Sequence, residues 1–184
     1  MVIAKEPRTN FLAEAGLARI LAVGILVVLA LALQSAVLAR MTLLGVIPQL
    51  VLVVVVSLAY LQGERAGVVA GFAGGLLQDL LLPQSIVGLT ALVYTLIAYG
   101  VGYLRQYTTA ESVWTPVLAV AIASAIAEVS YSCMAVLLGQ PWVSFGDTMK
   151  FTGLIVLYDT LLTPFVFPIV KRVSERVGSS RVYG

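Results

Sequence analysis

Two acidic residues, Glu128 and Asp159, interrupt apolar stretches of a 184-residue chain that is 60% hydrophobic. A charged carboxylate at the centre of a lipid bilayer costs at least ~2.5 kcal/mol on insertion scales. The functional hypothesis is therefore a proton or cation site. The structural hypothesis, which we favour, is an interhelical pair of acids that faces the interior, with at least one carboxyl neutral at pH 7. The expected hydrogen-bond partners of this pair are Ser130, Tyr131 and Tyr158.

A third acid, Asp79, stands beside Gln78 near the expected end of another apolar stretch. Two roles suit an acid at this place: it caps a neighbouring helix, or it lines a cavity that opens to the outside. Gln34 lies near the outer end of the first apolar stretch, at a level similar to that of Asp79, and it is expected to lie beside Asp79. An outward-facing trio of Gln34, Gln78 and Asp79 above two deep acids would suit the binding of a small polar molecule.

Several kinds of chemistry have no support in the sequence. There is no histidine, which disfavours haem ligation, most zinc sites and the usual general base of an intramembrane serine protease. The one cysteine, Cys133, allows no disulfide within the chain. No glycine-rich loop follows a strand, and the net charge of +2 does not favour a nucleic-acid partner. We therefore expect no enzyme activity, no cofactor and no metal site.

Six apolar segments must position these polar residues. A helix needs about 20 mostly apolar residues to span a bilayer, and fewer serve when polar residues flank it. Because each span must satisfy its own backbone, helices are expected and strands are not. The sequence thus predicts an all-α membrane protein with six transmembrane helices in one bundle, at about Leu17–Leu38, Ile47–Leu61, Gly67–Leu82, Val87–Leu104, Val113–Leu138 and Met149–Val170.

The basic residues predict the orientation of this bundle. When alternate connections are assigned to opposite sides, nine of the eleven basic residues fall on one side, and only Arg40 and Lys150 fall on the other. Short loops rich in Lys and Arg stay in the cytoplasm. Both termini are therefore expected in the cytoplasm, with a tail over 1–16, a membrane domain over 17–170 and a basic tail over 171–184 that is attracted to anionic lipid.

The third segment carries glycines at a spacing that favours close helix packing. Gly67, Gly71 and Gly75 recur every four residues, so they share one helix face. Small residues at this spacing let two helix backbones approach each other. We predict that this face packs in the interior of the bundle or against a partner.

The order of these motifs resembles MreD, the rod shape-determining membrane protein family of bacteria. The resemblance covers about residues 20 to 172, and its most specific pieces are Leu76–Gly88 and Tyr158–Pro168. This chain differs at two positions: MreD often has an acid where Gln49 follows Pro48, and an asparagine where this chain has Asp159. The resemblance depends on the runs Pro48–Val53, Gly67–Leu82, Val87–Leu89, Tyr99–Arg105 and Leu157–Pro168.

The resemblance implies a non-enzymatic scaffold of the cell-elongation machinery in the bacterial cytoplasmic membrane, which controls rod shape and peptidoglycan synthesis. Its implied partners are the transmembrane helix of MreC, together with MreB, RodA and a class-B penicillin-binding protein. The family is also similar in helix count and topology to the substrate-binding subunits of energy-coupling-factor vitamin transporters. The alternative function is therefore a substrate-binding membrane subunit of a small-molecule transporter, and that similarity is an analogy of fold.

Overall fold

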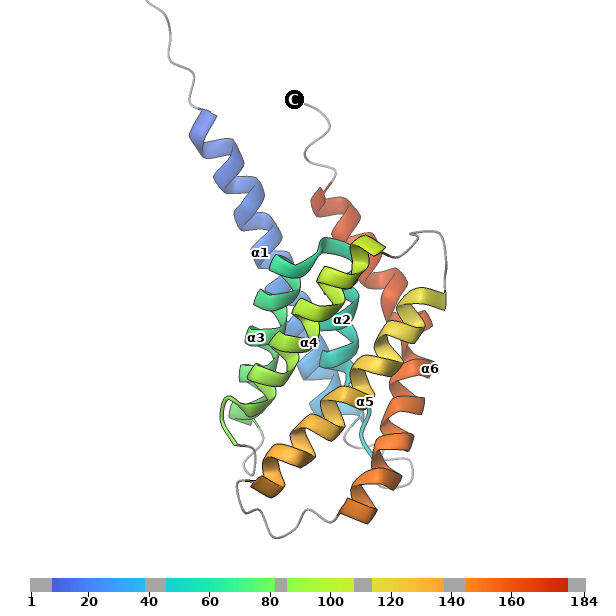
Figure 1. Cartoon of the computed structure of the whole chain (residues 1–184). Coiled ribbons are helices and arrows are strands. Elements are labelled where there is room, and N and C mark those ends of the chain that lie inside the picture. Colours follow the sequence, from blue (N-terminus) through green and yellow to red (C-terminus); the bar gives the residue numbers. More distant parts are fainter. Residues whose placement is uncertain (1–7, 39–45, 82–85, 108–113, 138–144, 179–184) are drawn as a thin grey trace, which may run out of the picture.

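The computed structural model describes residues 8–38, 46–81, 86–107, 114–137 and 145–178, which form six helices and two short helical turns (Figure 1). The prediction of an all-helical chain with six main helices is confirmed for these residues. In chain order the elements are α1 Arg8–Leu33 with a π-helical turn Gln34–Leu38, α2 Leu50–Gln62, α3 Glu64–Leu81, α4 Leu89–Leu104 with a 3₁₀ turn Arg105–Tyr107, α5 Trp114–Leu137 and α6 Phe145–Gly178.

Helix α2 forms the core of the bundle. Every residue from Leu50 to Tyr60 is buried, and the run of valines at 53–56 is at most 4% exposed. A helix that is apolar on all faces has no side suited to water and belongs in the centre of a protein or in lipid. The other five helices all contact α2, so it is the element around which the bundle is built (Figure 1).

Four of the remaining helices pack as two pairs around this core, and α1 packs against α2 and α3. α3 and α4 make the most extensive contact, and α5 packs along α6. The connection between α2 and α3 is a single residue, Gly63, whose φ of 91° lies in the region that favours glycine. This tight turn makes α3 double back directly beside α2.

Two helices extend into the segments that the sequence predicts as tails. α1 begins at Arg8 and α6 continues to Gly178. In α6 the extension carries an exposed pair in which Lys171 Nζ lies 3.9 Å from Glu175 Oε1, one helical turn later. Helix formers and such i,i+4 pairs suit an exposed helix end, although one exposed pair adds little stability. The apolar composition that defined the segments therefore marks only part of each helix.

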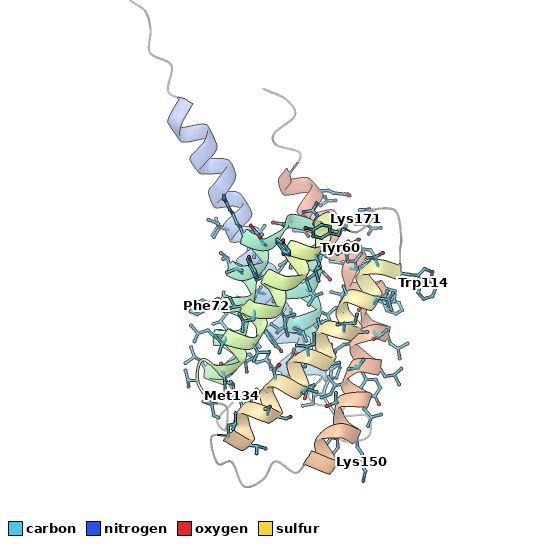
Figure 2. All side chains as sticks on the ribbon, in the orientation of Figure 1. Tyr60, Phe72, Trp114, Met134, Lys150 and Lys171 are labelled. Carbon is cyan, nitrogen blue, oxygen red and sulfur yellow. The ribbon has the colours of Figure 1, made fainter. Side chains whose placement is uncertain are left out.

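The outer helices present large apolar side chains outward along their length (Figure 2). By length and composition two helices are sufficient to cross a membrane among the described residues, Trp114–Met134 and Lys150–Arg176. Three shorter apolar helices accompany them: Ile20–Ala36, Leu50–Gln62 and Leu89–Leu104. Examples of the outward side chains, all at least half exposed, are Ile20, Phe72, Leu96, Leu118 and Phe165.

The two ends of the bundle differ in their basic residues. α1 begins and α6 ends at the same end, and Figure 2 places Lys171 at that end and Lys150 at the other. The turn between α2 and α3 and the turn after α4 also lie there, and they bring Arg65 and Arg105 to it. Three of the basic residues in the sequence-based orientation, Lys5, Arg40 and Arg181, lie outside the described residues.

Candidate functional site

The N-terminus of α2 meets the middle of α5 and α6 at Asp159. The backbone N–H of Gln49 donates a hydrogen bond of 2.8 Å to Asp159 Oδ1, and the hydroxyl of Ser124 donates one of 2.6 Å to Oδ2. Asp159 and Ser124 are both fully buried. Each carboxyl oxygen of Asp159 therefore accepts a bond from a different helix, which meets the demand of a buried acid for polar partners.

The side chain of Gln49 extends this contact to two more helices. Its Nε2 donates a hydrogen bond to Glu128 Oε1 in α5, and its Oε1 accepts one of 3.0 Å from the Tyr94 hydroxyl in α4. The same hydroxyl lies 3.4 Å from Gln78 Oε1 in α3. We call Gln49, Gln78, Tyr94, Ser124, Glu128 and Asp159 the central polar network, and it joins α2, α3, α4, α5 and α6.

The two deep acids lie close together, because both accept hydrogen bonds from Gln49. Their partners include Gln49 and Ser124, which the expected set of Ser130, Tyr131 and Tyr158 left out. Gln49 gave one signal in the sequence: it is the polar residue that directly precedes an unbroken apolar run. Ser124 gave a weaker signal, since nothing in the sequence shows which face of α5 meets α6.

Gln34 satisfies a second backbone group of α2. Its Oε1 accepts a hydrogen bond of 3.0 Å from the N–H of Val51, in the first turn of α2. The first N–H groups of any helix lack partners within the helix, and inside a membrane protein they need other acceptors. Gln34 belongs to the π-helical turn at the end of α1, so this bond also fixes α1 against α2.

Asp79 performs a similar task at the N-terminus of α4. Its Oδ2 accepts hydrogen bonds from the backbone N–H groups of Gly88 at 2.9 Å, Thr90 at 3.0 Å and Ala91 at 3.3 Å. The carboxyl group is buried, and Gly88 takes a left-handed conformation with φ of 94° at the helix start. An acid is also favoured there by the positive end of the helix dipole.

These contacts divide the trio of Gln34, Gln78 and Asp79 among different tasks. Gln34 caps α2, Asp79 caps α4, and Gln78 bonds to Tyr94 in the central polar network. Of the three, only Gln78 lines the polar cavity described below. The trio therefore does not form a single outward-facing site, because Gln34 and Asp79 accept hydrogen bonds from backbone N–H groups at helix N-termini.

The glycines of α3 allow two backbones to lie in direct contact. A Cβ on Gly71 would lie 2.7 Å from the carbonyl oxygen of Tyr94, and one on Gly75 would lie 2.5 Å from Cα of Ala91. A Cβ on Gly67 would lie 2.6 Å from a side-chain carbon of α2. No real Cβ tolerates such distances, so this face needs glycine. It is covered by α4 and α2 of the same chain.

Gly102 continues this packing at the other end of α4. A Cβ there would lie 2.5 Å from Cα of Glu64, at the start of α3. Gly102 was not among the glycines expected to pack closely. Nothing in the sequence distinguishes it from Gly100, at which a Cβ would meet nothing within 4 Å.

A polar cavity of about 230 Å³ opens beside the central polar network. The half-buried Glu128 lines it, whereas Asp159 and Ser124 do not. The cavity therefore offers a carboxyl, two amides and hydroxyl groups to a small polar molecule or to water. Its lining comes from Gln49, Gln78, Thr90, Val93, Tyr94, Ala127, Glu128 and Tyr131.

The arrangement fits a hydrogen-bonded junction better than a catalytic centre. In the described part of the chain, no three His, Cys, Asp or Glu side chains gather as a metal ion would require. The Ser124 hydroxyl bonds to Asp159, but both are fully buried and lie away from the cavity lining. A nucleophile has to reach its substrate, and this buried pair does not line the cavity.

In the comparison with known proteins, a family model described as rod shape-determining protein MreD matches residues 17–173. The searches of curated proteins and of solved structures gave no match.

Proposed function

The chain belongs to the MreD family of rod shape-determining membrane proteins, and from this premise we propose that it is a non-enzymatic scaffold of the bacterial cell-elongation machinery. The observation that carries the proposal is the use of the buried polar groups. Gln49, Asp159 and Asp79 are engaged in hydrogen bonds that hold helices together. A protein that presents fixed surfaces to partners needs such a rigid interior, since polar networks with satisfied partners specify one arrangement.

In this proposal all six helices cross the bacterial cytoplasmic membrane and both termini lie in the cytoplasm. The shared end of α1 and α6, with Lys171 there and Lys150 opposite, supports this orientation (Figure 2). The short helices α2 and α4 fit the proposal because their N-termini are capped by Asp159, Gln34 and Asp79. Segments without regular structure are tolerated at membrane depth when protein buries them.

The proposed partners are the transmembrane helix of MreC and, through the assembled machinery, MreB, RodA and a class-B penicillin-binding protein. They follow from family membership. The outward apolar side chains of α1, α5 and α6 support a role in helix association, because a neighbouring helix or lipid must cover them in the membrane.

Depletion of the protein in a rod-shaped native host tests the scaffold role. We expect the cells to become round, and a plasmid copy of the wild-type gene should restore rods. Affinity purification of the tagged full chain from native membranes should recover MreC. Normal cell shape after complete depletion would contradict the proposal.

The polar cavity favours one second candidate, a substrate-binding membrane subunit of a small-molecule transporter. Thr90→Val separates the two functions, because Thr90 lines the cavity and its bond to Asp79 comes from the backbone N–H, which the substitution keeps. The change preserves shape and size but removes a hydroxyl. Both functions predict normal cell shape for this variant. The transporter function predicts that uptake of the transported small molecule is lost, and the scaffold function predicts that small-molecule uptake is unchanged.

A further inference from the structure

A long apolar groove runs between α4 and α5 on the outside of the bundle. It has a volume of about 570 Å³. On α4 its lining extends from Leu89 to Arg105, and on α5 from Thr115 to Met134, so it follows both helices for most of their length. The floor at one end is Tyr60 of α2. In a membrane protein such a groove faces lipid directly.

The charge in the groove lies at one end only. Among the groove's lining residues Arg105 is the single charged one, and it also lines a small pocket together with Glu64 at the start of α3. Arg105 follows the end of α4, which lies at the end of the bundle that also carries Lys171. Trp114, the first residue of α5, is exposed and projects outward (Figure 2). A guanidinium matches the geometry of a phosphate group. Tryptophan is common at the level of lipid headgroups.

The length of the groove suits an acyl chain. The α4 side spans 16 residue steps from Leu89 to Arg105, or roughly 24 Å at 1.5 Å per residue. One leaflet contributes about half of the ~30 Å hydrocarbon core. An acyl chain whose headgroup lies beside Arg105 would therefore fit within the groove over its whole depth in that leaflet.

We propose that the α4–α5 groove binds one anionic phospholipid of the surrounding bilayer, with its phosphate at Arg105 and an acyl chain along Leu96 and Leu118. This site is separate from the central polar network. The proposal depends on membrane location and not on the scaffold role, so the failure of one leaves the other standing. Basic pockets between membrane helices are known to select anionic headgroups.

Native mass spectrometry of the purified full chain tests the site with two lipids of identical acyl chains, phosphatidylglycerol and phosphatidylcholine. The wild-type protein should retain phosphatidylglycerol preferentially. Arg105→Gln should reduce that preference about fivefold, the factor expected for one basic residue near the surface. Arg65→Gln is the matched control, because Arg65 is an exposed basic residue outside the groove.

A second variant tests the acyl-chain part of the site. Gly100 lines the groove and a Cβ there meets nothing within 4 Å, so Gly100→Leu fills the groove without a clash. It should reduce retention of both lipids. Gly153→Leu is its control, since that glycine is exposed on α6 and also has open space. Thermal unfolding shows that each variant is folded, and phosphatidylglycerol should raise the Tm of both controls but not of Arg105→Gln.

Three results would overturn the proposal. The first is equal lipid retention by Gly100→Leu and Gly153→Leu. The second is an unchanged preference for phosphatidylglycerol in Arg105→Gln. The third is capture of a protein rather than lipid by a photo-crosslinker placed at Leu96 in native membranes, which would make a partner helix the occupant of the groove.

Discussion

The backbone N–H of Gln49 lies 2.8 Å from Asp159 Oδ1, although 110 positions separate the two residues in the chain. The bond joins the N-terminus of the central helix to the middle of α6. The side chain of the same glutamine bonds to Glu128 in α5 and accepts from Tyr94 in α4. One residue therefore determines how four helices meet, and changes around it give sharp tests.

Asp159→Leu should destabilise the protein strongly. The substitution leaves the Gln49 N–H and the Ser124 hydroxyl without their buried acceptor. An unsatisfied buried group costs about 1–3 kcal/mol, so the free energy of unfolding should fall by at least about 2 kcal/mol. Thermal unfolding of the purified protein in detergent measures the loss. Asp159→Asn should lose much less, because its oxygen still accepts from Gln49.

The control for the Asp159 variants is Glu128→Gln, which replaces the other deep acid with an amide of the same shape. Glu128→Gln retains an oxygen that accepts from Gln49 Nε2, so stability and cell shape should both stay close to wild type. If Glu128→Gln and Asp159→Asn keep normal stability but fail to restore rod shape, the acids act as a proton or cation site. The structural role would then be refuted.

Gln49→Glu should destabilise the protein, and Asp159→Asn should partly reverse the effect. The new carboxyl would face Glu128 in place of an amide donor and bring a third acid to the junction. Asp159→Asn then returns the number of acids at the junction to two. A coupling energy of about 0.5–3 kcal/mol is expected for groups in one network, measured from the unfolding of both single variants and the double variant. Strictly additive effects would show that the two positions act independently.

The same contact joins the two positions at which this chain differs from the resemblance. MreD often has an acid at position 49 and an asparagine at position 159, whereas this chain has Gln49 and Asp159. Positions 49 and 159 are in direct contact in this structure, where they place one amide side chain beside one acid. The sequence alone showed them as two separate differences, 110 positions apart.

Much of the fold follows from local patterns in the sequence. The apolar segments predicted six helices, and the four-residue spacing of Gly67, Gly71 and Gly75 predicted a closely packed face. The extension of α6 to Gly178 was missed because exposed helix ends carry no apolar pattern. The role of Gln49 was missed for another reason: it depends on which helices surround the N-terminus of α2, and no local pattern contains that information.

Asp79→Leu should loosen the start of α4. It removes the acceptor of the N–H groups of Gly88, Thr90 and Ala91, with an expected loss of about 1–3 kcal/mol. Asp79→Asn should lose far less, because asparagine and aspartate cap helices about equally well. Hydrogen exchange at residues 88–92 measures the effect locally. Equal protection in the wild type and Asp79→Leu would contradict a capping role.

The C-terminus should lie in the cytoplasm. A reporter that is active only in the cytoplasm should therefore be active when fused after Gly184, and a reporter that is active only in the periplasm should be inactive there. The expectation comes from the basic residues, of which Lys171 lies at the end of the bundle where α1 begins and α6 ends. A reporter inserted next to Lys150, at the opposite end, is the internal control and should show periplasmic activity. Periplasmic activity of the fusion at Gly184 would reverse the proposed orientation.

Gly71→Leu should prevent stable folding, because its side chain would be forced into the backbone of α4. The clash begins at Cβ, which would lie 2.7 Å from the carbonyl oxygen of Tyr94, and that carbonyl cannot rotate away as a flexible side chain could. Overpacking in a core typically costs 1–3 kcal/mol, and contact with backbone places this change at or above the upper end, about 3 kcal/mol.

Gly153→Leu adds the same side chain to an exposed face of α6 where a Cβ has open space, so it separates the clash from the general effect of a leucine. Protein level in the membrane, thermal unfolding and restoration of rod shape should all be reduced in Gly71→Leu and normal in Gly153→Leu. Identical behaviour of the two variants would contradict the close backbone contact between α3 and α4 at Gly71.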